Sequence, residues 1–104
     1  MHSKDKIINL AIQVLPRSES RDAYVIIDHV IDVIKSSGVK HVVCPFETVM
    51  EGTYDQLIHV VKKVHDQCFR EGAKEVLINI KIQSNRDSNV FIEDKISKYI
   101  NKNL

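Results

Sequence analysis

The order in which two kinds of hydrophobic periodicity follow one another constrains this chain more than any other feature. Four segments have the apolar/polar alternation or the β-branched composition of strands, and two longer segments repeat apolar residues at helical spacing. The predicted strands cover residues 7–15, 39–44, 48–51 and 74–83, and the predicted helices cover residues 22–37 and 53–70. This βαββαβ order predicts an α+β, ferredoxin-like fold, in which a four-stranded antiparallel sheet carries two helices on one face. A third helical pattern, over residues 91–100, predicts a short additional C-terminal helix that covers a sheet edge or a neighbouring subunit.

Residues with strong turn and capping preferences separate these segments. Pro16 is expected to end the first strand, and Ser20 is expected to be the N-cap of the first helix. Gly38 stands at the position of a C′ glycine after that helix. The run Thr53-Tyr54-Asp55-Gln56 has the form of a capping box and predicts where the second helix begins. A chain of 104 residues is expected to form one domain over residues 1–104.

Two helices cover only one face of such a sheet, so the alternation also predicts the side chains of the other, open face. From the first and last strands these are Asn9, Ala11, Gln13, Leu15, Leu77, Asn79, Lys81 and Gln83. Amides among small and apolar residues are typical of a half-buried surface, because a buried amide needs hydrogen-bond partners. One interpretation is a subunit interface, which the residues by themselves favour. The other is a small-molecule pocket in which Gln13 and Asn79 orient the ligand.

The stretch 44–52, Cys-Pro-Phe-Glu-Thr-Val-Met-Glu-Gly, is chemically the densest part of the chain. We expect a hairpin turn that presents Phe46 and Thr48 toward the amide-lined face. An aromatic residue after a proline can stack on a flat heterocycle, or it can instead hold the hairpin against the helices. Glu47 and Glu51 are candidate acid and base groups, but their spacing has no catalytic signature. One of them can simply favour a nearby helix N-terminus.

Composition argues against several classes of partner. The apolar fraction is 43%, the charged fraction is 28% and the formal net charge is +1, whereas a nucleic-acid partner requires a concentrated basic face. No apolar run reaches the length of a membrane span, and no signal-peptide core is found. We therefore expect a cytoplasmic protein without a nucleic-acid or membrane partner. Cys44 and Cys68 are expected to be free thiols that act as small apolar side chains.

Neither a metal centre nor a catalytic motif is predicted. The five histidines are His2, His29, His41, His59 and His65, and none has a zinc-binding spacing with the cysteines. Three glycines at element boundaries cannot form a phosphate-binding loop, and no nucleophile has a recognisable local signature. We expect no metal, no cofactor and no catalytic residue.

The motif Pro45-x-x-Thr48-x-x-Glu51-Gly52, which opens an amphipathic helix, resembles the signature of the small thiamine-binding proteins related to YkoF. The similarity extends to Val-Leu-Pro at 14–16, Glu-Gly-Ala at 71–73 and Ile-Glu-Asp-Lys-Ile at 92–96, and so covers nearly the whole chain. The resemblance implies a ferredoxin-like fold, dimers and often tetramers, and binding of thiamine or its hydroxymethylpyrimidine portion without catalysis. It places Thr48 and Glu51 beside the ligand region.

The chain departs from this family pattern at Cys44 and Glu47, where a small residue, often glycine, is frequent. A glutamate at the mouth of a pocket would favour the cationic thiazolium of thiamine and would hinder a phosphorylated vitamin.

We therefore predict a homodimer or homotetramer that binds thiamine or hydroxymethylpyrimidine and catalyses no reaction. The predicted ligand-binding residues are Gln13, Phe46, Thr48, Glu51 and Asn79, of which Gln13, Phe46 and Asn79 come from the strand pattern and not from the family motif. Two alternatives stay open: a structural or regulatory homo-oligomer without a small ligand, and an enzyme that acts on a small metabolite through Glu47 or Glu51.

Overall fold

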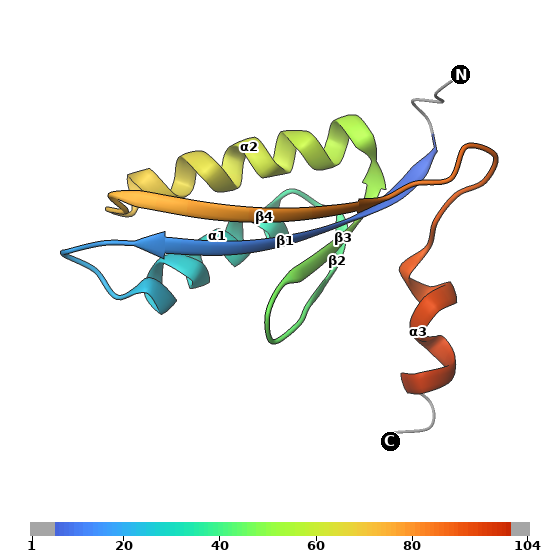
Figure 1. Ribbon diagram of the computed structural model, residues 1–104, viewed down its shortest axis with the longest axis horizontal. Helices are drawn as coiled ribbons and strands as arrows, with labels where there is room; N and C mark the ends of the chain where they lie inside the picture. Colours follow the sequence, from blue (N-terminus) through green and yellow to red (C-terminus); the bar gives the residue numbers. More distant parts are fainter. Residues whose placement is uncertain (1–5, 101–104) are drawn as a thin grey trace.

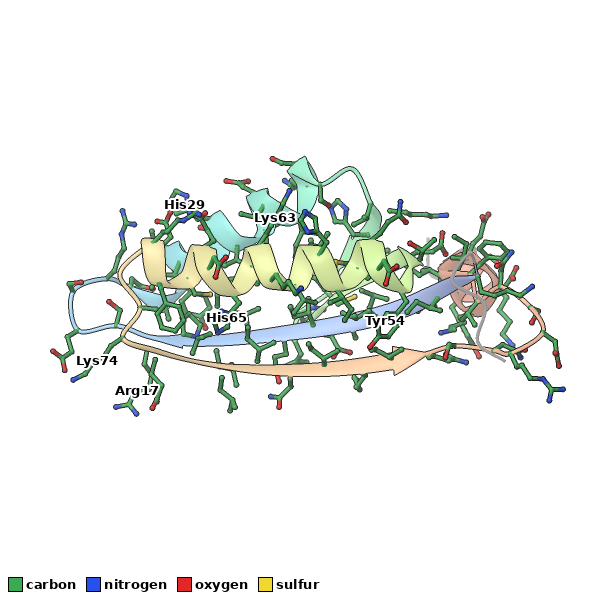
Figure 2. The ribbon with its side chains drawn as sticks, turned by 90° about the horizontal axis from the view of Figure 1, so that it is seen from above. Arg17, His29, Tyr54, Lys63, His65 and Lys74 are labelled. Carbon is green, nitrogen blue, oxygen red and sulfur yellow. The ribbon has the colours of Figure 1, made fainter. Side chains whose placement is uncertain are left out.

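The computed structural model describes residues 6–100 and contains the predicted elements in the predicted order. These are β1 (Ile7–Arg17), α1 (Ala23–Ser36), β2 (Lys40–Val43), β3 (Thr48–Thr53), α2 (Tyr54–Arg70), β4 (Glu75–Gln83) and α3 (Ile92–Ile100). The strands form one antiparallel sheet in the order β2-β3-β1-β4. Helices α1 and α2 lie on the same side of the sheet (Figures 1 and 2). The ferredoxin-like prediction is confirmed.

The hydrophobic core lies between the sheet and these two helices. Strands β1 and β3 point every second side chain into the core, and α1 and α2 each contribute one stripe of apolar side chains. Its most buried members are Ile8, Leu10, Ile12, Ile26, Ile34, Met50, Leu57, Val30, Val64 and Cys68. Each large aliphatic side chain contributes roughly 1.5–3 kcal/mol by leaving water, and this burial determines which face of each strand meets the helices.

Strand β1 is longer than predicted, because Pro16 does not end it. Pro16 lies opposite Val76 of β4, and the pairing continues to Arg17 and Glu75. On its other side β1 is paired with β3 only from Ile7 to Ile12. Beyond that point β1 behaves as an edge strand, where a proline without an N–H group is tolerated.

The predicted N-cap is confirmed for α2 but not for α1, whereas Gly38 follows the C-cap Ser37 with a positive φ of 80°, as predicted for a C′ glycine. Thr53 and Gln56 form a capping box. The Thr53 N–H donates to Gln56 Oε1 at 3.0 Å, and the Gln56 N–H donates to Thr53 Oγ1 at 3.3 Å. For α1 the N-cap is Asp22, whose carboxylate accepts a 2.7 Å hydrogen bond from the Tyr24 N–H group. The prediction of Ser20 was wrong, because Asp22 is the last residue with extended backbone before the helix.

The open face of the sheet carries the predicted residues of β1 and β4, as the register of the two strands confirms. Helix α3 lies beside the end of the sheet where β1 begins and β4 ends (Figure 1). Its first residue, Ile92, is buried, and the Lys95 ammonium donates a 2.8 Å hydrogen bond to Asn9 Oδ1. The Asn9 amide in turn donates to the carbonyl of Val90 at 3.0 Å. This amide of the predicted open face therefore holds the C-terminal helix in place.

Within residues 6–100, no helix combines the length and the apolar character that crossing a membrane requires.

Candidate functional site

A groove opens where β1 runs on past the β2–β3 hairpin, and we call it the hairpin groove. Its walls are the end of β1, the hairpin turn and the exposed flank of α1, and its volume is about 740 Å³. The lining consists of Ile12, Gln13, Val14, Leu15, Pro16, Arg17, Ala23, Tyr24, Ile27, Val30, Ile31, Ile34, Val43, Cys44, Pro45, Phe46, Glu47, Thr48, Glu75 and Leu77. This size and this mainly apolar lining are those of a small-molecule site.

The hairpin turn determines the shape of one wall. The Cys44 N–H group donates a 2.9 Å hydrogen bond to the Glu47 carbonyl, which closes the turn and confirms the predicted hairpin. The turn projects Phe46 away from the core, so that 82% of this side chain is exposed. The structure therefore contradicts the interpretation of Phe46 as a side chain that holds the hairpin on the helices.

Thr48 lines the groove from the face opposite to the predicted one. It lies across from Ile12 in the register and is only 7% exposed, on the side of the sheet that meets the helices. The expectation that it shares a face with the amides was wrong, because Thr48 has the parity of the core residue Met50. It nevertheless reaches the groove, because the groove passes around the unpaired edge of β1.

The Thr48 hydroxyl forms no hydrogen bond within the described part of the chain. No side-chain nitrogen or oxygen of the described residues is both fully buried and unbonded. The hydroxyl is therefore accessible from the groove and available to a ligand.

The two predicted amides lie together on the open face. The Asn79 amide donates a 3.1 Å hydrogen bond to Gln13 Oε1, which orients Gln13 at the groove. The NH₂ group of Gln13 has no partner among the described residues. Asn79 is not part of the lining, so it acts on the groove through Gln13.

The groove lining carries one more carboxylate than cation, and a lysine just outside the lining pairs with one of the carboxylates. The lining contains two carboxylates, Glu47 and Glu75, and one guanidinium, Arg17. Glu47 also pairs with Lys81 at 3.1 Å, and Arg17 pairs with Glu75 at 3.2 Å. These exposed pairs remain open to competition by a ligand.

Glu51 lies outside the hairpin groove. Its carboxylate accepts a 2.7 Å hydrogen bond from the Ile92 N–H group at the start of α3, and its side chain is only 10% exposed. A negative charge at a helix N-terminus is favourable. In the structure, Glu51 therefore attaches α3 to the sheet and does not join the other predicted ligand residues.

A second depression, the α3 cleft, lies between the open face and α3 and has a volume of about 330 Å³. It is lined by Asn9, Ala11, Val42, Cys44, Val49, Lys81, Ile82, Gln83, Ile92, Lys95 and Ile96. Its two charged side chains, Lys81 and Lys95, are both cationic. Lys81 pairs with Glu47, whereas Lys95 has only amide partners among the described residues, so the charge of Lys95 disfavours a cationic ligand in this cleft.

The cysteines and histidines form no reactive centre in residues 6–100. Cys68 is buried, as predicted, and burial raises the pKa of its thiol, which keeps it protonated and unreactive. Cys44 is only half-buried and contributes to both depressions. The described residues contain no group of three or more His, Cys, Asp and Glu side chains that could hold a metal ion. His2 lies outside the described residues.

Two groups of groove residues were not predicted from the sequence. Tyr24 is 78% exposed on the flank of α1, off the apolar stripe that the helical period identifies. Leu15 and Leu77 are cross-strand neighbours that we assigned to the open face but not to the site. The sequence marks these three residues in one way only: each is a large apolar or aromatic residue at a position that the periodicity assigns to solvent.

Nearly the whole chain is similar to known proteins. The sequence profile of a family described as "Thiamine-binding protein" matches residues 10–100. A UPF0045 protein from Clostridium perfringens is 41% identical over 91 residues, which are 88% of this chain and 95% of the relative.

Two solved structures are similar over most of their length. A domain of unknown function (DUF77) from Bacillus cereus has a TM-score of 0.88 and 33% identity, and the match covers 95% of each chain. A Thermotoga maritima protein, provisionally assigned to thiamine biosynthesis or salvage, has a TM-score of 0.81 and 29% identity; the match covers 89% of this chain and 98% of that one. The resemblance to small thiamine-binding proteins is confirmed.

Proposed function

This chain belongs to the thiamine-binding protein family, and from that membership we propose that it binds thiamine, or its hydroxymethylpyrimidine portion, in the hairpin groove without catalysing a reaction. The observation that carries the proposal is the exposure of Phe46 at a groove of about 740 Å³. An exposed aromatic ring costs solvation free energy unless a partner covers it. A pyrimidine ring is flat and can stack on its face.

The other groove residues supply the polar part of the recognition. The Thr48 hydroxyl and the Gln13 NH₂ group are available for hydrogen bonds to the edge of the pyrimidine. Glu47 gives the mouth of the groove a negative charge that attracts the permanent cation of the thiazolium. Asn79 orients Gln13. Glu51 contributes indirectly, by holding α3 against β3.

Calorimetric titration with thiamine, thiamine phosphate and hydroxymethylpyrimidine tests the proposal. We expect saturable binding of thiamine and of hydroxymethylpyrimidine, and weaker binding of the phosphate because Glu47 repels it. The absence of both heat and a thermal shift with all three compounds would reject the proposed function.

The variant Thr48→Val is expected to bind thiamine about 2- to 12-fold more weakly, because one hydrogen bond contributes roughly 0.5–1.5 kcal/mol. Its melting temperature should hardly change, since the hydroxyl has no partner among the described residues. Thr53→Val is the matched control: it removes the cap of α2, so it should lower the melting temperature and leave affinity unchanged. An equal loss of stability in Thr48→Val would show that the hydroxyl is structural.

The enzyme alternative is the weaker one. Glu47 immediately precedes β3, and Glu51 lies four residues later, within β3. In an extended strand this spacing separates their Cα atoms by roughly 13 Å. Each carboxylate already has a partner, Lys81 for Glu47 and the Ile92 N–H group for Glu51. Two carboxylates so far apart do not act on the same bond.

Assembly into a homodimer or homotetramer belongs to the same proposal. Leu15 and Leu77 lie side by side on the open face, and Leu77 is 59% exposed. A second copy that covers this patch would also close the groove from that side. The cytoplasmic location stays a prediction.

A further inference from the structure

Strand β1 has an unpaired backbone edge inside the hairpin groove. Strand β3 pairs with β1 only as far as Ile12, opposite Thr48, whereas β4 accompanies β1 to Arg17. Figure 1 shows β1 continuing past the β2–β3 hairpin. Residues 13–17 therefore have a strand on one side only, and all of them line the groove.

The alternation of a strand identifies the backbone groups on that edge. Ile7 directs both its groups toward the chain that follows β4: its N–H donates to Asn89 Oδ1 at 2.8 Å and its carbonyl accepts from Val90 at 2.9 Å. The Arg17 carbonyl accepts from Lys74, just before β4, at 2.7 Å. Alternate residues of a strand point their backbone groups to opposite edges, so odd-numbered residues of β1 face β4.

Val14 is consequently the residue whose N–H and C=O groups both face the unpaired side. Pro16 faces the same side but has no N–H group to satisfy. None of the loop, turn and side-chain hydrogen bonds of the described residues involves the Val14 backbone. The Val14 N–H and C=O groups therefore lie at the groove wall as a donor and an acceptor that no strand pairs with.

Resting on the proposed function, we infer that the Val14 backbone forms two hydrogen bonds with the pyrimidine of the ligand. An aminopyrimidine presents a ring nitrogen, an acceptor, next to an amino group, a donor, as a paired strand would. The ring nitrogen accepts from the Val14 N–H, and the amino group donates to the Val14 carbonyl. The ligand class is therefore 4-aminopyrimidines, and the residue that selects it acts through its main chain.

The inference predicts discrimination against the analogue in which oxygen replaces the amino group, oxythiamine. That ring carries an acceptor oxygen beside a ring N–H donor, the reverse order. It can form both bonds only by turning over, which sends the thiazolium-bearing substituent in the opposite direction and away from Glu47. We expect oxythiamine to bind at least about tenfold more weakly than thiamine, since two hydrogen bonds are lost or mispaired.

Amide hydrogen exchange of the full-length protein, followed by NMR, tests the inference directly. Without ligand the Val14 amide should exchange at least about tenfold faster than that of Leu15, which faces β4. Saturating thiamine should slow the exchange at Val14 by about tenfold or more and leave Leu15 unchanged. Slow exchange at Val14 without ligand would mean that a second copy of the chain covers this edge, and would overturn the inference.

A backbone ester in place of the Val14 amide, introduced by chemical synthesis, removes the Val14 N–H donor and also weakens the Gln13 carbonyl as an acceptor toward β4. It should weaken thiamine binding by about 2- to 12-fold and lower the melting temperature less than the same change at Leu15, which removes an N–H group that faces β4. If thiamine and oxythiamine bind equally well, the backbone recognition is wrong while the proposed function stands. If thiamine does not bind at all, the proposed function itself fails.

Discussion

Replacement of Phe46 by alanine is expected to weaken thiamine binding by about 5- to 150-fold, because stacking of a base-like ring on an aromatic side chain contributes roughly 1–3 kcal/mol. The melting temperature should hardly change, since 82% of the Phe46 side chain is already exposed and little packing is lost. Titration calorimetry of the variant, with thermal unfolding measured in parallel, provides both numbers.

Phe69→Ala is the matched control for this variant. Phe69 is also partly exposed, at 45%, but it lies on α2 and contacts His65 with their rings 5.2 Å apart, outside the hairpin groove. It should leave thiamine affinity unchanged. An unaltered affinity in Phe46→Ala would contradict a site at this groove even if the wild-type protein binds thiamine.

The wild-type protein is expected to sediment at micromolar concentration with the mass of at least two chains, and Leu77→Lys is expected to convert it to a monomer. Leu77 is 59% exposed next to Leu15, and a lysine buried in an apolar interface would lack a partner for its charge. Sedimentation velocity at several concentrations distinguishes the two states.

Phe69→Lys controls for the general effect of an added charge, because it changes an apolar side chain on α2, away from the open face. It should sediment as the wild type does. A wild-type protein that sediments as one chain throughout the micromolar range would remove the proposed interface.

The position of Thr48 shows why the candidate site could be predicted only in part. Its presence in the site was expected from the family motif, and it does line the groove. Its face was predicted wrongly, because a shift of one residue between strands exchanges the two faces, and the turn at 45–47 does not reveal that shift. Glu51 was likewise expected near the ligand, but its carboxylate contacts α3, a helix whose position no local pattern encodes.

Four features could be predicted from the sequence: the order of the elements, the sheet with its two covering helices, the capping box of α2 and the residues of the open face. Those features follow from periodicity and short-range preferences, which involve neighbours along the chain. The position of the hairpin groove, in contrast, depends on the tertiary structure. The hairpin groove exists because β1 extends five residues beyond its pairing with β3, from Gln13 to Arg17. The unpaired backbone of Val14 has the same cause. Such a feature depends on how far two strands separated in the chain remain paired, which the pattern of neither strand contains.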